Sequence, residues 1–259
     1  MLKVGIVGMG VIGTNIAKAI TAGIPGVTLA GVHVRDQATA RGYPAFPLPE
    51  LVQRSDLVVE AATQAALREF APAVLSAGRH LMVLSVGGLL GVLDEWVRLA
   101  EKHGCRILVP SGAIAGLDGV KGCREGVVTS VSMETRKPPR GLAGAPYIQE
   151  KRINLDAITQ ETLIFEGAAT EACRAFPANV NVVAALSLAG VGPERTRIKV
   201  FAVPGLARNT HRITLEGEFG RLQIQVENVP SENPRTGKLS YLSAIAFLRD
   251  LGATLRVGT

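Results

Sequence analysis

Residues 3–15 read KVGIVGMGVIGTN, and this stretch decides the fold class of the first half of the chain. Lys3 to Val7 is an apolar run typical of a buried strand. The turn Gly8-Met9-Gly10-Val11-Ile12-Gly13 follows it, and a helical pattern runs on from Thr14. A second strand is predicted from Val27 to Val34. The whole segment is therefore one β-turn-α-β unit of about 30 residues.

The three glycines of the turn have separate roles in a dinucleotide-binding unit. Gly8 permits the tight turn, Gly10 lets the backbone approach a pyrophosphate, and Gly13 lets helix and strand pack closely. The helix that opens at Val11 and Ile12 offers unpaired N–H groups and the positive end of its dipole to the phosphates. A lone glycine pattern is weak evidence, but its place between a strand and a helix is what the mechanism requires. We predict that these five residues bind a nicotinamide dinucleotide.

The end of the second strand bears on which dinucleotide is bound. An acidic residue near position 34 would hydrogen-bond the adenosine ribose, but Val34 stands there, followed by Arg35 and Asp36. Arg35 can pair with the 2′-phosphate of NADP, or it is simply a solvated loop residue. Asp36 would still reach the ribose if the strand were longer. We predict NADP or NAD, with dual use allowed and NADP favoured by Arg35 and Val34.

The order of predicted elements defines two domains. Strands at 56–61, 80–86 and 106–110 alternate with helices at 64–77 and 93–103, which predicts a parallel sheet with helices on both faces. After about residue 125 the pattern changes to period-two runs, and the last two flank Gly217 and Gly220 as a hairpin. We predict an α/β chain with a Rossmann-type domain at 1–110, completed by a C-terminal helix within 236–259. Residues 111–235 then form an α+β substrate and dimerisation domain with a mixed or antiparallel sheet.

Composition excludes several functional classes. The 259 residues are 47% hydrophobic and 19% charged, which suits a sizeable core. The net charge of +6 is scattered rather than gathered in a stripe, and only 4% of residues are aromatic, so nucleic-acid binding is not expected. Cys105, Cys123 and Cys173 form neither a disulfide framework nor a metal motif, which favours a reducing cytoplasm and no metal. We expect no signal peptide before Lys3, and the apolar stretch 81–93 is too short to span a membrane.

Two loops carry small or amide side chains where a ligand is expected. The segment PSGAIAGLDG at 110–119 follows the last strand of the parallel sheet, and its small residues allow close backbone approach. The alternative is a helix-opening turn capped by Ser111. The segment FPANVNV at 176–182 places Asn179 and Asn181 before an apolar helix. Each amide either caps that helix or hydrogen-bonds a carboxamide such as that of nicotinamide.

His211 lies in the segment NTHRI at 209–213, which opens a predicted strand. It shares strand parity with Ile213 and Leu215, so it is predicted to point toward the apolar face. A histidine in that position is either a satisfied core residue or a base next to amide and cationic neighbours.

Taken together, these segments resemble the L-aspartate dehydrogenase family. The matching motifs are GMGVIG at 8–13, PSGAIAGLDG at 110–119, KPP at 137–139, FEG at 165–167, FPANVNV at 176–182, NTHRI at 209–213 and ENPRTGKLS at 232–240. The resemblance implies oxidation of L-aspartate to iminosuccinate with NAD(P), or the reverse amination of oxaloacetate. It also implies a homodimer and a link to NAD biosynthesis. It makes His211 the active-site histidine, with Ala113 and Asn181 against the nicotinamide.

This chemistry has further requirements. A base with a pKa near neutrality is suited to take a proton from the substrate amine or to activate water, and His211 qualifies. The two substrate carboxylates need cationic or amide partners, for which the candidates are Lys137, Arg208 and Lys238.

One position departs from the family pattern. Val203-Pro204 stands where the family usually has Asp-Pro. This departure leaves open an enzyme that acts on a different amino or imino acid. A separate alternative is a dinucleotide-sensing module without turnover.

Overall fold

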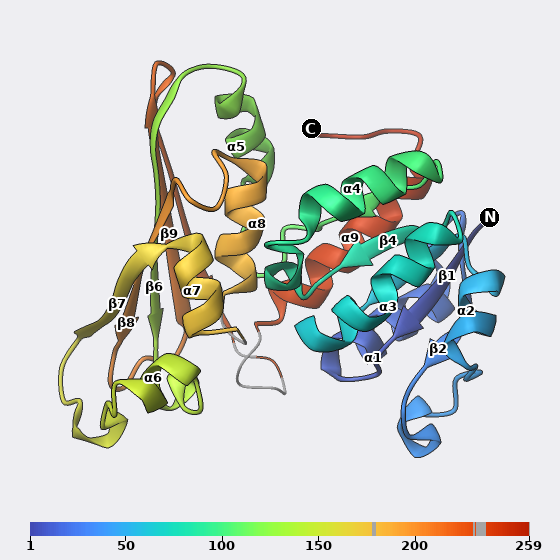
Figure 1. Ribbon diagram of the computed structural model, residues 1–259, viewed down its shortest axis with the longest axis horizontal. Coiled ribbons are helices and arrows are strands. Elements are labelled where there is room, and N and C mark those ends of the chain that lie inside the picture. Colours follow the sequence, from blue (N-terminus) through green and yellow to red (C-terminus); the bar gives the residue numbers. More distant parts are fainter. Residues whose placement is uncertain (178–179, 230, 232–236, 259) are drawn as a thin grey trace. The chain divides into compact units, whose positions relative to one another are not determined.

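The structure, a computed structural model, describes residues 1–177, 180–229, 231 and 237–258 (Figure 1). The chain forms two compact units. Among the described residues, the first contains those of Met1–Pro110 and Tyr241–Val257, and the second contains those of Ser111–Ser240 together with Gly258.

The first unit is built on a five-stranded parallel sheet of order β2-β1-β3-β4-β5. The predicted parallel sheet is thus confirmed, although only two residues of the run 106–110 pair as a strand. The strands are β1 (Leu2–Val7), β2 (Val27–His33), β3 (Leu57–Glu60), β4 (His80–Val83) and β5 (Ile107–Leu108). The helices are α1 (Val11–Gly23), α2 (Leu48–Arg54), α3 (Gln64–Ser76), α4 (Leu93–Lys102) and α9 (Leu239–Gly252), with 3-10 turns η1 (Gln37–Ala40) and η2 (Val86–Leu89).

Helix α9 belongs to the core of this unit although it comes from the far end of the chain. Its Ala244 and Leu248 are fully buried, in the same apolar cluster as Ile6 of β1 and Ile16 of α1. In Figure 1 the red α9 lies among the blue and cyan elements of the parallel sheet. The apolar spacing of α1, with Ile16 and Ile20 buried, provides the other half of that contact.

The second unit has a five-stranded mixed sheet of order β10-β9-β6-β8-β7. The β6–β8 pair is parallel and the other pairs are antiparallel, and the predicted β9–β10 hairpin is confirmed. The strands are β6 (Val128–Lys137), β7 (Thr162–Ala168), β8 (Thr196–Ala202), β9 (Asn209–Gly217) and β10 (Gly220–Asn228). The helices are α5 (Leu117–Arg124), α6 (Pro146–Glu150), α7 (Ala169–Ala175) and α8 (Asn181–Ala189), with 3-10 turns η3 (Pro139–Leu142) and η4 (Leu155–Ala157).

One face of this mixed sheet is covered by helices. Helices α5, α7 and α8 lie together on that side in Figure 1. Alternate residues of β6 and β9, such as Met133 and Ile213, are buried, while the residues between them are more exposed. Period-two alternation therefore predicts which side chains enter the layer between sheet and helices.

Strand β7 has no counterpart in our sequence prediction. Its register shifts between Leu163 and Phe165, and the adjacent Ile164 and Phe165 are both buried. The bulge removes the strict alternation by which a half-buried strand is recognised.

Candidate functional site

The glycine turn after β1 has the geometry that a bound pyrophosphate requires. Gly8 has a φ of +95°, and a Cβ there would lie 2.6 Å from the carbonyl oxygen of Ala61. A Cβ on Gly13 would collide with the carbonyl oxygen of Gly8. A Cβ on Gly10 would meet nothing within 4 Å. The first and third glycines are thus required by the protein itself, whereas the second leaves open space at the surface.

Helix α1 begins beside that open space. Gly10 is its N-cap residue, without a side-chain cap, and the first turn contains no acidic residue. The N–H groups of Val11, Ile12 and Gly13 have no acceptor within the helix because they belong to its first turn. These donors and the helix dipole suit the pyrophosphate of a dinucleotide.

A buried carboxylate organises the same edge of the sheet. Glu60 ends β3 and is fully buried. Its Oε1 accepts from the Ala62 N–H at 2.8 Å and the Ser85 hydroxyl at 2.9 Å. Its Oε2 accepts from the N–H groups of Leu84 at 3.1 Å and Ser85 at 2.7 Å. Burial raises the pKa of Glu60, and these hydrogen bonds oppose that rise.

Glu60 joins the loops that follow β3 and β4, and it directly precedes Ala61, whose carbonyl oxygen leaves no room for a Cβ on Gly8. Our sequence prediction missed this role. The available signal was a carboxylate at the end of an otherwise apolar buried strand, which requires hydrogen-bond donors.

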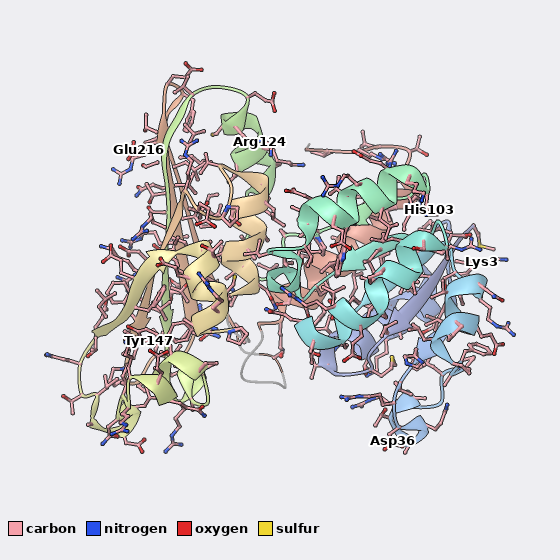
Figure 2. The ribbon with its side chains drawn as sticks, viewed as in Figure 1. Lys3, Asp36, His103, Arg124, Tyr147 and Glu216 are labelled. Carbon is pink, nitrogen blue, oxygen red and sulfur yellow. The ribbon has the colours of Figure 1, made fainter. Side chains whose placement is uncertain are left out.

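The residues after β2 are placed for contact with solvent or a ligand. Arg35 is exposed and has no ion-pair partner among the residues that the structure describes. Asp36, labelled in Figure 2, uses its Oδ1 to accept from the Ala38 N–H at 3.0 Å, which caps η1. One oxygen of Asp36 is therefore engaged locally, while the Arg35 guanidinium is available.

His211 lies in the buried layer of the second unit. It pairs in register with Thr135 of β6, and the Thr135 Oγ1 lies 3.1 Å from the His211 Nδ1. Lys137 follows two residues later on β6, so it shares a face with Thr135. The exposed fractions are 2% for Thr135, 4% for His211 and 5% for Lys137. The structure thus gathers a hydroxyl, an imidazole and an amine on one buried face.

The electrostatics of this cluster are unusual for two basic groups. Burial lowers the pKa of Lys137 to about 8. Burial, together with the positive charge of Lys137, lowers the pKa of His211 to about 3. At neutral pH His211 is therefore neutral, and Lys137 is charged but close to its titration range. Strongly shifted groups that lie together are characteristic of functional sites.

Ala113 and Asn181 are both half-buried in the second unit. Asn181 is the first residue of α8, whereas Val180 occupies the cap position. The Ala113 carbonyl accepts from Asn228 Nδ2 at 2.7 Å, and Asn228 is buried opposite Asn209 in the hairpin. Sequence reasoning missed Asn228.

The alternative role of Ser111 as a helix cap is wrong. Helix α5 begins six residues later, at Leu117, with Gly116 in the cap position. Asn179 and the stretch 232–236 of the ENPRTGKLS motif lie outside the described residues.

The other two candidate cations lie at the surface. Arg208 is exposed and forms an ion pair with Glu227 at 3.8 Å. Lys238 is exposed just before α9. Of the three predicted substrate cations, the structure brings only Lys137 beside His211. Within the described ranges, no helix has both the length and the apolar character to cross a membrane.

Comparison with known proteins adds independent findings. A family model described as aspartate dehydrogenase, C-terminal, matches residues 118–251, and one described as homoserine dehydrogenase, NAD binding domain, matches residues 8–110. The chain is 46% identical over 271 residues to the L-aspartate dehydrogenase of Methanosarcina barkeri, covering all of both chains. It is 46% identical over 266 residues to that of Bradyrhizobium diazoefficiens, covering 100% of this chain and 94% of the relative.

A solved structure shares the fold. The crystal structure of aspartate dehydrogenase from Thermotoga maritima superposes with a TM-score of 0.80, at 24% identity and with full coverage of both chains.

Proposed function

Since the chain belongs to the L-aspartate dehydrogenase family, we propose that it transfers hydride from the Cα of L-aspartate to a nicotinamide dinucleotide, giving iminosuccinate. The reverse reaction is the reductive amination of oxaloacetate. The observation that carries the proposal is the buried cluster of His211, Lys137 and Thr135 in a chain with full-length relatives of this name.

We propose that the first unit binds the cofactor and the second unit supplies the substrate site. The open Gly10 and the free N–H groups of Val11, Ile12 and Gly13 support pyrophosphate binding. Such a cofactor supplies the hydride acceptor when it is bound. Ala113 and Asn181 are assigned to the nicotinamide from the family resemblance.

The preferred cofactor is NADP, with NAD also accepted. The exposed Arg35 supports this choice because its guanidinium has no partner in the described part of the chain, and a 2′-phosphate would provide one. Val34 offers no acceptor to the ribose hydroxyls of NAD.

His211 is proposed as the catalytic base. The substrate amine must lose a proton before its lone pair can form the imine. For the His211 Nε2 to accept a proton, the Nδ1 must carry the ring hydrogen, and the Thr135 oxygen lies where it can accept from that Nδ1–H. A pKa of about 3 makes the resting imidazole a poor base.

Substrate binding would reduce that weakness. Burial is the larger cause of the low His211 pKa, and the positive charge of Lys137 adds to it. A substrate carboxylate paired with Lys137 would cancel much of this charge and so remove the smaller of the two contributions. His211 would therefore be a stronger base with aspartate bound than without it. Arg208 and Lys238, both exposed, remain candidates for the second carboxylate.

The remaining assignments are supported by the family resemblance. We propose a homodimer, a cytoplasmic location and a role in NAD biosynthesis. The buried, unpaired Cys105 and Cys173 suit a reducing compartment.

The test is the initial rate of absorbance change at 340 nm with L-aspartate, run in parallel with NAD and NADP. His211→Ala should reduce turnover by about 10²–10⁴-fold. Arg212→Ala, on the exposed face of the same strand, is the matched control and should leave the rate unchanged. An unaltered rate in His211→Ala would contradict the assignment of His211 as the catalytic base.

A panel of other amino acids addresses the Val203 departure. Faster turnover of another amino acid than of aspartate would assign that amino acid as the substrate. Tight cofactor binding without any turnover would indicate a sensing module instead.

A further inference from the structure

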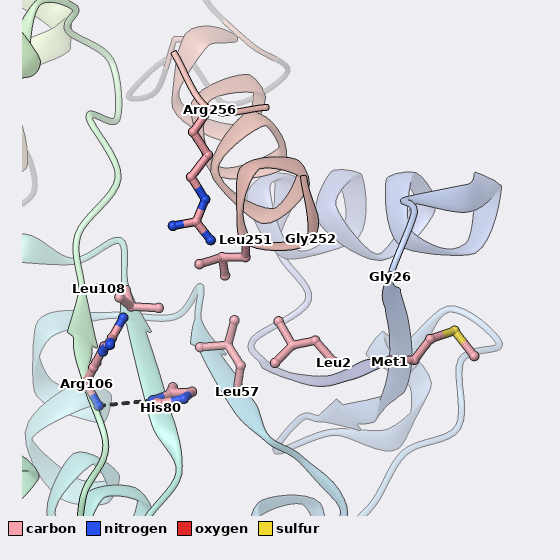
Figure 3. Close-up of a pocket in the computed structure, with 10 residues that line it drawn as sticks. All are labelled: Met1, Leu2, Gly26, Leu57, His80, Arg106, Leu108, Leu251, Gly252 and Arg256. Carbon is pink, nitrogen blue, oxygen red and sulfur yellow. Dashed lines mark hydrogen bonds between the residues drawn. The ribbon is translucent and has the colours of Figure 1, made fainter. Parts of the chain in front are cut away.

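A pocket lies in the first unit, at the opposite edge of the parallel sheet from the glycine turn. It has a volume of about 390 Å³. Its walls come from the amino ends of the strands, including Leu2 of β1, Leu57 of β3 and His80 of β4, and from the end of α9 (Figure 3). The glycine turn follows the carboxyl end of β1, so this strand-start pocket is separate from the proposed cofactor site.

The floor of the strand-start pocket is aliphatic. Leu2, Leu57, Leu108 and Leu251 all line it, and Figure 3 shows Leu57 and Leu2 side by side across the middle. One wall is held closely by backbone contact, because a Cβ on Gly252 would lie 2.6 Å from the carbonyl oxygen of Pro25. The shape of this wall is therefore fixed by close backbone packing and not by side-chain rotamers alone.

The polar side chains that line the pocket are two arginines and one histidine. Arg106 and Arg256 are both exposed, and neither guanidinium forms an ion pair with the residues described by the structure. The His80 Nδ1 accepts from the Arg106 backbone N–H at 3.1 Å, which leaves the Nε2 as the protonated donor.

No acidic residue is among the described residues that line the pocket. The neighbouring Asp56 uses its Oδ2 to accept from the Lys3 N–H at 2.8 Å. The charged side chains that line the pocket are therefore both positive.

We propose that the strand-start pocket binds a small aliphatic carboxylate. Its carboxylate group would lie between the guanidiniums of Arg106 and Arg256, and its hydrocarbon chain would lie on the leucine floor. Guanidinium groups bind carboxylates through paired hydrogen bonds, and four leucines favour an alkyl body over a polar one. Such a ligand would also tie the chain after α9 to the start of the sheet.

The test is isothermal titration of the whole protein with octanoate, with acetate and octanol as comparison ligands. Octanoate should bind one to one with a dissociation constant of about a millimolar, as suits a ligand with about ten non-hydrogen atoms. Acetate lacks the chain and octanol lacks the charge, so both should bind much more weakly. Saturating NADP should leave octanoate binding unchanged because the two sites lie at opposite edges of the sheet.

Variants assign the binding to the two arginines. Arg106→Gln and Arg256→Gln should each weaken octanoate binding by about tenfold. The control is Arg98→Gln on α4, an exposed arginine of the same unit outside the pocket, which should bind as the unaltered protein does. Equal affinity in all three variants, equal binding of octanol, or an absence of saturable binding would each overturn the proposal. None of these outcomes depends on aspartate oxidation.

Discussion

Replacing Lys137 with Met should stabilise the protein while reducing aspartate oxidation. Burial lowers the pKa of Lys137 from 10.5 to about 8. Each pKa unit corresponds to about 1.4 kcal/mol, so holding this charge in the folded state costs about 3 kcal/mol. Met keeps most of the side-chain volume and carries no charge. We therefore expect the free energy of unfolding at pH 7 to rise by as much as that amount.

The pH dependence fixes the sign of this effect. The folded pKa of Lys137 lies below the unfolded value, so the folded state releases its proton first as the pH rises. The free-energy cost of burying the charged Lys137 is present in full below pH 8, shrinks between pH 8 and 10.5, and is absent above pH 10.5. The advantage of Lys137→Met should accordingly narrow as the pH is raised from 7 to about 10.

The assay is urea unfolding followed by circular dichroism at both pH values. Lys199→Met is the matched control, because Lys199 is a half-exposed lysine on the adjacent β8, paired with Glu166 at 3.6 Å. It should change stability by no more than about 0.5 kcal/mol. A Lys137→Met protein that is less stable at pH 7, or whose advantage does not narrow with pH, would refute burial as the cause. Retained aspartate oxidation would refute the carboxylate-binding role.

Three further predictions concern the proposed substrate and cofactor sites. Thr135→Val should lower kcat by about tenfold with little change in the KM for aspartate, and Thr135→Ser should restore it, because the hydroxyl oxygen can accept the His211 Nδ1–H and so hold the ring with its Nε2 as the proton acceptor. A loss that Ser does not restore would indicate a packing role. Glu60→Gln should lower the free energy of unfolding in urea by about 1–3 kcal/mol, because the side-chain amide cannot accept all the hydrogen bonds that the carboxylate accepts. Unchanged stability would contradict this account. Gly13→Ala should lower the thermal unfolding midpoint of the cofactor-free protein, whereas Gly10→Ala should leave that midpoint unchanged and weaken NADP binding. Equal midpoints for the two variants would show that the turn relaxes to accommodate a Cβ at Gly13.

The fold was largely predictable where local pattern and packing agree. The strand, glycine turn and helix at the start form a self-contained signal, and the hairpin of β9 and β10 is marked by Gly217 and Gly220. Strand β7 escaped prediction because its bulge places Ile164 and Phe165 both inside. Strand order in the mixed sheet also depends on long-range pairing, which no local window contains.

The candidate site was predictable only in part. Strand parity was enough to predict that His211 points into the apolar layer, and its burial confirms this. Its hydrogen bond to Thr135 was not predictable, because it joins residues on two strands far apart in the sequence. The hydrogen bonds of Glu60 and Asn228 likewise depend on loops brought together by the fold. The pKa shift of His211 follows from burial beside Lys137, which only the three-dimensional arrangement shows.

The return of α9 to the first unit has a consequence for protein synthesis. The cluster around Ile6 and Ile16 is closed by Ala244 and Leu248, which leave the ribosome only after the whole second unit has been made. Until then, the apolar surface that α9 covers in the folded protein is exposed on the nascent first unit, where it can bind chaperones or associate with other chains. An expression fragment that stops at residue 110 should therefore be aggregation-prone, whereas a circular permutant that joins α9 directly to β1 should fold early.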